Sequence, residues 1–247
     1  REMGFADRFA NSLDAVSDRD FVAEALFDLA LIGTHLSRIG EEWVLWTSEE
    51  FGFATLDDRY ATGSSMLPQK KNADIAELAR GKAGRLIGNL TGLLTTLKGL
   101  PLAYNRDLQE DKEPLFDSYD QVSLAVGALT GMIQTATFNA DRMRAAADVQ
   151  SLSATDLAEY LVRKGTPFRQ AHAIVGALVQ EALSGSQSLL QLVASSPEFD
   201  ADAQQLIGPG VGVQLRSSPG AAGPLAADDQ RARFASAIAS LRTSLAI

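Results

Sequence analysis

The sequence predicts an all-α fold, in which a bundle of long helices is followed by a smaller helical domain. Three observations predict it. Prolines are so widely spaced that the intervals 1–67, 69–100 and 115–166 contain none, and an interior proline would break a helix. Apolar residues in these intervals recur in steps of three and four. Strand-like alternation of apolar and polar residues is scarce.

Each of the three intervals carries its own apolar series. The first runs along Val22, Ala25, Leu29, Ile32, Leu36, Ile39, Trp43 and Trp46. The second is Leu86, Leu90, Leu93, Leu97 and Leu100, and the third is Leu115, Tyr119, Val122, Val126, Leu129 and Ile133. A spacing near 3.5 residues per turn is typical of helices packed against near-parallel neighbours. Ser17 or Asp18 is expected to cap the first helix, before Phe21.

The pattern changes after about residue 149. Shorter helical segments are expected over 155–165 and 168–185, and glycine and proline then cluster over 207–224, which predicts turns. A closing helix is expected over about 227–245. We therefore predict a central bundle domain over residues 1–149 and a small helical domain over residues 150–247.

Composition excludes several classes of function. A net charge of −9 and a pI near 4.8 argue against a nucleic-acid-binding protein, which needs a basic surface to meet phosphate. No apolar run is long enough to span a bilayer, and no signal segment opens the sequence. The sequence has no cysteine, and two histidines are too few for a histidine-built metal centre. We expect a soluble, cytoplasmic protein without a metal or a membrane partner.

The segment TGSSMLPQKKN (62–72) interrupts the helical pattern with small and cationic residues. Gly63 permits unusual backbone angles, and Asn72 could cap the helix that follows. A serine beside a lysine and a helix N-terminus could stabilise an anion. The spacing fits neither the phosphate-binding loop nor the Ser-x-x-Lys pattern. From these residues alone, a solvated linker and an anion-binding loop are equally open.

A second polar segment, YNRDLQEDKE (104–113), also lies between predicted helices. It holds an aromatic hydroxyl, amides, acids and cations. The residues alone favour a charged surface turn over a binding site.

Taken together, the two segments resemble a known family. GSSMLPQKKN is similar to the signature loop of the fumarase/aspartase superfamily, Gly-Ser-Ser-x-Met-Pro-x-Lys-x-Asn. Gln69, the paired lysines and the run GKAGRLIGNLTGLLTTLKGLPLAYNRDLQEDKE narrow the resemblance to argininosuccinate lyases, as do NSLDAVSDRDF (11–21) and ATDLAEYLVRKGTPFRQAH (154–172). The resemblance thins after about residue 185. Met66 and Leu67 are transposed relative to the usual order, Ala73 stands where the family generally has proline, and the tail SSPGAAGP only partly matches the family.

This resemblance implies an enzyme of arginine biosynthesis and the urea cycle, which reversibly splits argininosuccinate into arginine and fumarate without cofactor or metal. The implied catalytic residues are Ser64 as the base and Lys70, which stabilises the serine oxyanion. The implied substrate-binding residues are Asn72, Tyr104, Gln109 and Lys112. A serine hydroxyl is a weak base, so the implied mechanism depends on closure of the signature loop over the substrate.

The resemblance also implies a homotetramer in which each active site draws on three chains. The family's general-acid histidine lies far upstream of the signature loop, beyond the 63 residues that precede Ser64 here. We therefore expect the bundle domain over residues 1–149 to be incomplete at its N-terminus. We also expect the 247-residue chain to lack that histidine and to be inactive by itself. His35 and His172 are expected to be structural or surface residues.

Alternatives remain within and outside the superfamily. Adenylosuccinate lyase, aspartase and fumarase are other lyases of this type, although the segments 69–71 and 104–113 count against each. A structural protein of the delta-crystallin kind, or an oligomerisation module, would keep the fold without catalysis. The joint presence of the six implied site residues favours the enzyme.

Overall fold

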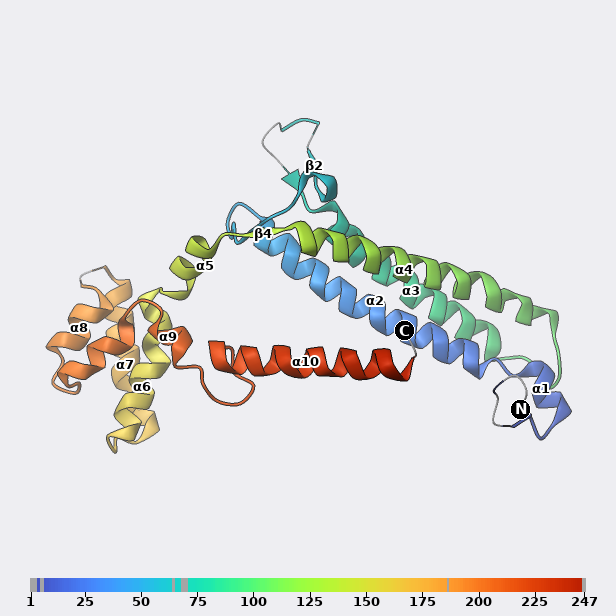
Figure 1. Cartoon of the computed structure of the whole chain (residues 1–247). Helices are drawn as coiled ribbons and strands as arrows, with labels where there is room; N and C mark the ends of the chain where they lie inside the picture. Colours follow the sequence, from blue (N-terminus) through green and yellow to red (C-terminus); the bar gives the residue numbers. More distant parts are fainter. Residues whose placement is uncertain (1–3, 5–6, 64, 68–70, 186, 246–247) are drawn as a thin grey trace. The chain divides into compact units, whose positions relative to one another are not determined.

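In a computed structural model, residues 4, 7–63, 65–67, 71–185 and 187–245 are described. The chain divides into two compact units, Arg1–Asn139 and Ala140–Ile247. Helices account for most of each unit (Figure 1), and the only strands among the described residues form two two-residue ladders. The all-α prediction is therefore confirmed. The domain ranges 1–149 and 150–247 remain a prediction.

The first unit is built on three long helices that run side by side (Figure 1). These are α2 (Asp20–Thr47), α3 (Asp74–Leu97) and α4 (Lys112–Thr135), preceded by α1 (Ser12–Ser17). The residues that fill the space between them recur in steps of three and four, as expected for such packing. The buried set includes Val22, Leu26, Ala30, Trp43, Ala76, Ala79, Leu86, Leu93, Val122, Leu129 and Met132.

The N-cap of α2 differs from the expectation. Arg19 occupies the N-cap position, and no side chain caps it there. The prediction of Ser17 or Asp18 was wrong because Ser17 ends α1 and Asp18 is the C-cap of that helix. The Asp18 carboxylate still accepts the backbone N–H of Asp20 at 3.1 Å, so an amide of the first turn is satisfied from one position earlier.

Two glycines allow α2 and α3 to approach closely. A Cβ at Gly40 would lie 2.4 Å from the backbone oxygen of Ala76, and one at Gly33 would lie 2.3 Å from a methyl of Leu86. Glycine lowers helix propensity, so both positions weaken α2 by themselves. The close contact of the two helix backbones depends on this loss of side chain.

Short paired segments connect α2 to α3 and follow α4. The first ladder pairs β1 (Ala54–Thr55) with β4 (Thr137–Phe138), and the second pairs β2 (Thr62–Gly63) with β3 (Lys71–Asn72), both antiparallel. A 3₁₀ turn, η1 (Asp58–Tyr60), lies between β1 and β2. A longer one, η2 (Arg106–Asp111), leads into α4.

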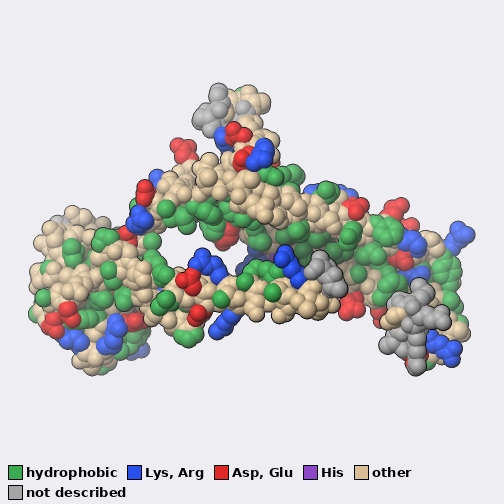
Figure 2. All heavy atoms as spheres, viewed as in Figure 1, with side chains coloured by type: hydrophobic (Ala, Val, Ile, Leu, Met, Phe, Trp, Pro, Cys, Tyr) green, Lys and Arg blue, Asp and Glu red, His purple; other side chains and the backbone are tan. Residues whose placement is uncertain are grey.

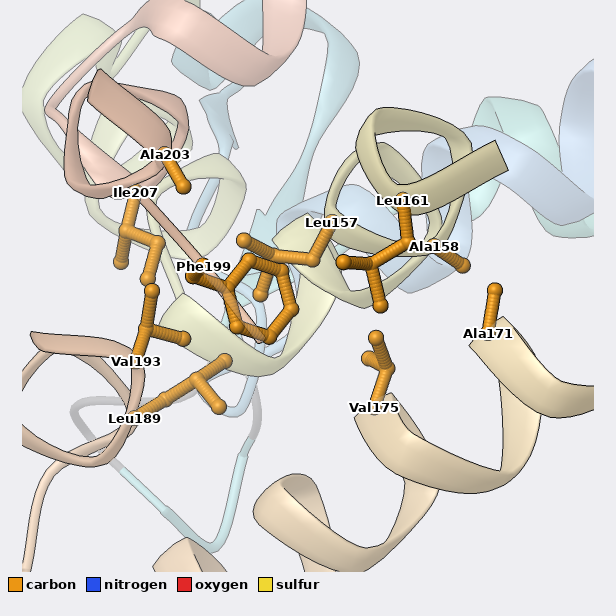
Figure 3. Packing of buried hydrophobic residues seen from close by; sticks show 10 residues of the cluster. All are labelled: Leu157, Ala158, Leu161, Ala171, Val175, Leu189, Val193, Phe199, Ala203 and Ile207. Atoms are coloured by element: carbon orange, nitrogen blue, oxygen red, sulfur yellow. The ribbon is translucent and has the colours of Figure 1, made fainter. Parts of the chain in front are cut away.

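The second unit has a separate core, shown in Figure 3. Its elements are α5 (Ala140–Ala147), η3 (Gln150–Ser153), α6 (Ala154–Arg163), α7 (Phe168–Leu183), α8 (Leu189–Ser195), η4 (Ala201–Ile207), α9 (Val211–Gln214) and α10 (Pro224–Ser244). Leu157 and Leu161 of α6 meet Val175 of α7, and Phe199 lies among them with Val193 of α8. No helix among the described residues of either unit is long and apolar enough to cross a membrane.

The turn-rich segment of the second unit is held by buried charge. Arg216 donates to both carboxylate oxygens of Asp156, at 2.5 and 3.0 Å, and the Asp156 side chain is almost fully buried. The segment includes the short helix α9, which the sequence analysis did not predict. The closing helix begins at Pro224, three residues earlier than expected, because proline suits the first helical position.

We predict that Gly40→Ala lowers the free energy of unfolding by about 1–3 kcal/mol, since the added methyl meets a backbone oxygen that cannot move away without separating the helices. Gly176→Ala, in α7, is the control: open space surrounds its Cβ position, and the helix should gain about 0.5–1 kcal/mol. Urea denaturation followed by circular dichroism measures both. Equal effects of the two variants would contradict the close approach at Gly40.

Candidate functional site

The two polar segments singled out in the sequence lie at opposite ends of one helix (Figure 1). The segment 62–72 precedes the N-terminus of α3, and the segment 104–113 follows its C-terminus. Since α3 has 24 residues, a rise of 1.5 Å per residue separates its ends by about 36 Å. The structure therefore does not bring the two segments together within one chain.

The two ends of the first segment, 62–63 and 71–72, are held together by hydrogen bonds. Thr62 pairs with Asn72 and Gly63 with Lys71 in the β2–β3 ladder. The carboxylate of Asp74, at the start of α3, accepts the backbone N–H of Thr62 at 2.7 Å. These contacts join the two ends of the segment directly to the N-terminus of α3. Ser64 and Lys70, the two expected catalytic residues, lie outside the described residues.

Asn72 was expected to cap α3, and this expectation was wrong. The N-cap position is Ala73, without a side-chain hydrogen bond to the helix. Asn72 lies one residue earlier because it pairs with Thr62 in the ladder. Its neighbour Lys71 forms an ion pair with Asp58 of η1, and both side chains are exposed, so this pair adds little stability.

A pocket of about 660 Å³ lies beside this ladder, between the end of α2 and the start of α3. Asn72 and Lys71 line one part of it, and Glu49 and Glu50 line another. Small and apolar residues complete the wall: Thr47, Ser48, Ala54, Thr55, Leu56, Ala61, Leu67 and Ala73. The pocket thus places an amide and a cation of the signature loop on a surface large enough for a small molecule.

The second segment owes its arrangement to the three-residue repeat of η2. Side chains three positions apart share a face of a 3₁₀ helix. Leu108 and Asp111 of η2 are buried, whereas Gln109 of η2 and Lys112, the first residue of α4, are exposed. The Gln109 amide donates a hydrogen bond to the hydroxyl of Tyr104. Three of the expected substrate-binding residues therefore gather at one end of the bundle.

Asp111 lies beneath this group, between two cations. It accepts a hydrogen bond from Arg19 Nε at 2.5 Å and one from Lys112 Nζ at 2.8 Å. Burial of the Asp111 carboxylate raises its pKa, but the bonds from Lys112 and Arg19 outweigh burial and hold the pKa below its usual value. Asp111 is therefore ionised at neutral pH.

Comparisons with known proteins identify the family. The family model described as Lyase matches residues 2–88, and the model described as Argininosuccinate lyase C-terminal matches residues 151–213. The argininosuccinate lyase of Frankia casuarinae is 56% identical over 228 residues, which make up 90% of this chain and 49% of that protein. This chain belongs to the argininosuccinate lyase family. It spans about half the length of the curated relatives that it matches.

A second curated argininosuccinate lyase, from Acidothermus cellulolyticus, is 60% identical over 203 residues, 80% of this chain and 42% of the relative. Among solved structures, EDDS lyase in complex with formate matches with a TM-score of 0.85 at 31% identity, covering 98% of this chain and 50% of that one. A variant of EDDS lyase with bound fumarate matches with a TM-score of 0.84 at 30% identity, covering the same shares of the two chains. Class II fumarase from Schistosoma mansoni matches with a TM-score of 0.70 at 16% identity, and the match covers 81% of this chain and 41% of the fumarase chain. This likeness shows the fold alone.

The argininosuccinate lyase resemblance selected six site residues, and the structure describes four of them: Asn72, Tyr104, Gln109 and Lys112. Their roles stay predictions. Of the two histidines, His35 is exposed on α2, and His172 lies on α7 with its ring centroid 6.0 Å from that of Phe168. In the described part of the chain, no group of three or more acidic or histidine side chains could hold a metal ion.

Sequence reasoning missed three residues that support these segments. Asp74 could have been expected at a helix start, because acids are favoured in the first turn, although its bond to Thr62 could not. Arg19 and Asp111 are 92 positions apart, and no local pattern links them.

We predict that Asp111→Asn makes the first unit less sensitive to acid. The lowered pKa of Asp111 means that its carboxylate stabilises the fold above about pH 4, its unfolded value, and loses this contribution as the pH falls through the folded value. The wild-type chain should therefore lose more thermal stability than Asp111→Asn on acidification below about pH 4. Melting temperatures by circular dichroism at several pH values measure this, and parallel curves for the two proteins would refute it.

Proposed function

We propose that this chain supplies part of an argininosuccinate lyase, which splits argininosuccinate reversibly into arginine and fumarate during arginine biosynthesis. The observation that carries the proposal is the segment 62–72, which keeps the superfamily's signature. The two ends of this segment pair with each other and are hydrogen-bonded to the N-terminus of α3. The family match and the exposed group of Tyr104, Gln109 and Lys112 support it. A cytoplasmic location and a place in the urea cycle belong to the same proposal.

In the proposed reaction, the ionised Ser64 hydroxyl takes a proton from the carbon next to a substrate carboxylate. The electron pair left on carbon forms the double bond of fumarate as the carbon–nitrogen bond breaks, and the arginine nitrogen is protonated by a general acid. Lys70 and the N-terminus of α3 stabilise the serine oxyanion and the negative charge that develops on the carboxylate. In the family, a histidine of an upstream segment helps to protonate the leaving nitrogen.

Substrate binding falls to the remaining four residues. Asn72, on the wall of the pocket beside the β2–β3 ladder, binds a carboxylate of the substrate. Tyr104, Gln109 and Lys112 hold other parts of it. The hydrogen bond between Gln109 and Tyr104 fixes both side chains before substrate arrives, which lowers the entropic cost of binding.

A complete site needs more than one copy of the chain. The signature segment and the Tyr104 group are separated by the length of α3, about 36 Å, which argininosuccinate cannot bridge. Figure 2 shows hydrophobic side chains along the surface of the long helices, and many are exposed, among them Phe21, Phe27, Leu78, Ile87, Phe116 and Leu124. Exposed apolar surface of this extent marks an association face. We therefore propose a homotetramer whose active sites are shared between subunits.

The same apolar surface also favours a second candidate, an assembly or structural role without catalysis. Such a protein would form tetramers and bind no substrate. Fumarate release separates the two candidates, because an assembly role does not depend on Ser64.

We predict that Ser64→Ala abolishes the release of fumarate from argininosuccinate. The release is measured by the ultraviolet absorbance of fumarate. The protein to test is this chain joined behind the upstream part of a curated relative, since the 247 residues span about half the length of those relatives. The loss should be about 10²–10⁴-fold, as for removal of a general base. Ser65→Ala, at the adjacent serine, is the matched control and should keep most of the activity. Equal losses at both positions would remove Ser64 from the role of base.

We predict that Ser64→Ala and Lys112→Ala, each inactive in the joined protein, regain activity when they are co-assembled. Some sites then combine an intact loop from one copy with an intact Lys112 from another, roughly a quarter of them if copies assemble at random. A mixture of Ser64→Ala with Lys70→Ala is the control, since both defects lie in one loop and no site becomes complete. Failure of the first mixture to exceed the second would contradict a shared site.

A further inference from the structure

The group formed by Arg19, Asp111 and Lys112 joins three parts of the first unit. Arg19 precedes α2, Asp111 ends η2 and Lys112 begins α4. Only Lys112 belongs to the expected binding residues. Asp111 and Arg19 lie beneath it, with 8% and 15% of their side chains exposed, whereas about half of the Lys112 side chain is exposed.

Asp111 is well placed to fix the position of the Lys112 ammonium group. Asp111 is buried in the 3₁₀ turn along with Leu108, so its carboxylate is largely shielded from solvent. Its Oδ1 accepts from Lys112 at 2.8 Å, and its Oδ2 accepts from Arg19 at 2.5 Å. Each oxygen therefore has a separate partner, and the two cations do not compete for one atom.

Arg19 is itself held in place. Its Nη1 donates to the backbone oxygen of Asp18 at 2.7 Å while its Nε donates to Asp111. A guanidinium suits this role because its donors are rigidly arranged and it stays charged at any physiological pH. The contact ties the start of α2 to the junction of η2 and α4.

The net charge of Arg19, Asp111 and Lys112 determines whether the group attracts an anion. With Asp111 alone, the Lys112 charge would be matched by one carboxylate and the pair would be neutral. Arg19 adds a second cation, so the three side chains together carry one net positive charge. That charge is presented by the exposed Lys112, since Arg19 is mostly covered. Such a group attracts a negatively charged part of a ligand.

We infer that Asp111 and Arg19 are positioning residues for Lys112: Asp111 holds its ammonium group in one place, and Arg19 offsets the charge of Asp111 so that Lys112 remains an effective anion-binding group. This inference rests on the proposed function for the identity of the anion, a carboxylate of argininosuccinate. The arrangement of the three side chains does not depend on it.

The positioning role is tested on the 247-residue chain without any substrate. The chain is treated briefly with acetic anhydride, and acetylation of Lys112 is measured by peptide mass spectrometry relative to Lys98. Asp111→Asn, which keeps the shape of the side chain, should raise the acetylation rate of Lys112 several-fold by releasing its amine. Glu41→Gln, which breaks the surface ion pair of Glu41 with Arg80, is the matched control and should leave the rate unchanged. An unchanged rate in folded Asp111→Asn, with folding checked by circular dichroism, overturns the positioning role.

The charge role is tested in the joined protein by steady-state kinetics. Arg19→Met should raise KM for argininosuccinate about tenfold and leave kcat nearly unchanged, as for loss of a binding interaction. Arg19→Lys, which keeps the charge, should restore most of the affinity. An unchanged KM in folded Arg19→Met overturns the charge role. A wild-type joined protein that releases no fumarate would count against the proposed function alone, because the acetylation result stands without it.

Discussion

The arrangement of the first unit depends on α3 as a continuous 24-residue helix packed between α2 and α4. Its length sets the separation of the two polar segments, because one precedes its first turn and the other follows its last. The close contact with α2 at Gly33 and Gly40 keeps α3 in register with its neighbour. A helix of this length does not bend enough to bring its own ends together, so the two segments do not meet within one chain.

Buried charge is handled in the same way in both units. Asp111 in the first and Asp156 in the second are nearly inaccessible, and each is paired with an arginine from a distant part of the chain. Among the described residues, no buried side-chain nitrogen or oxygen lacks a hydrogen-bond partner. An unpaired buried carboxylate would be costly, so these two aspartates fix the connections around them: the start of α4 in one unit and the turn-rich segment before α10 in the other.

The polar segments combine this support with exposure. Asp74 and the β2–β3 pairs hold the base of the signature segment, and Asp111 holds Lys112, while Tyr104, Gln109 and Lys112 remain open to solvent. The residues proposed to bind substrate are thus exposed groups whose neighbours are fixed. Preorganisation of that kind lowers the free energy needed to order a binding site.

The sequence by itself determined the helical fold and the candidate residues. The apolar spacing along 22–46 predicted α2 because side chains three and four positions apart share a helix face. The GSSMLPQKKN motif, together with the runs 11–21, 81–113 and 154–172, indicated the family through local residues alone. Helix ends were less predictable: Arg19 rather than Ser17 or Asp18 is the N-cap of α2, and Asn72 pairs in a ladder and does not cap α3. Only the tertiary structure decided that the two polar segments lie a helix length apart and that Arg19 meets Asp111 across 92 positions. The physical reason is that helix periodicity depends on residues a few positions apart in the sequence, whereas pairing between distant segments depends on how whole helices pack.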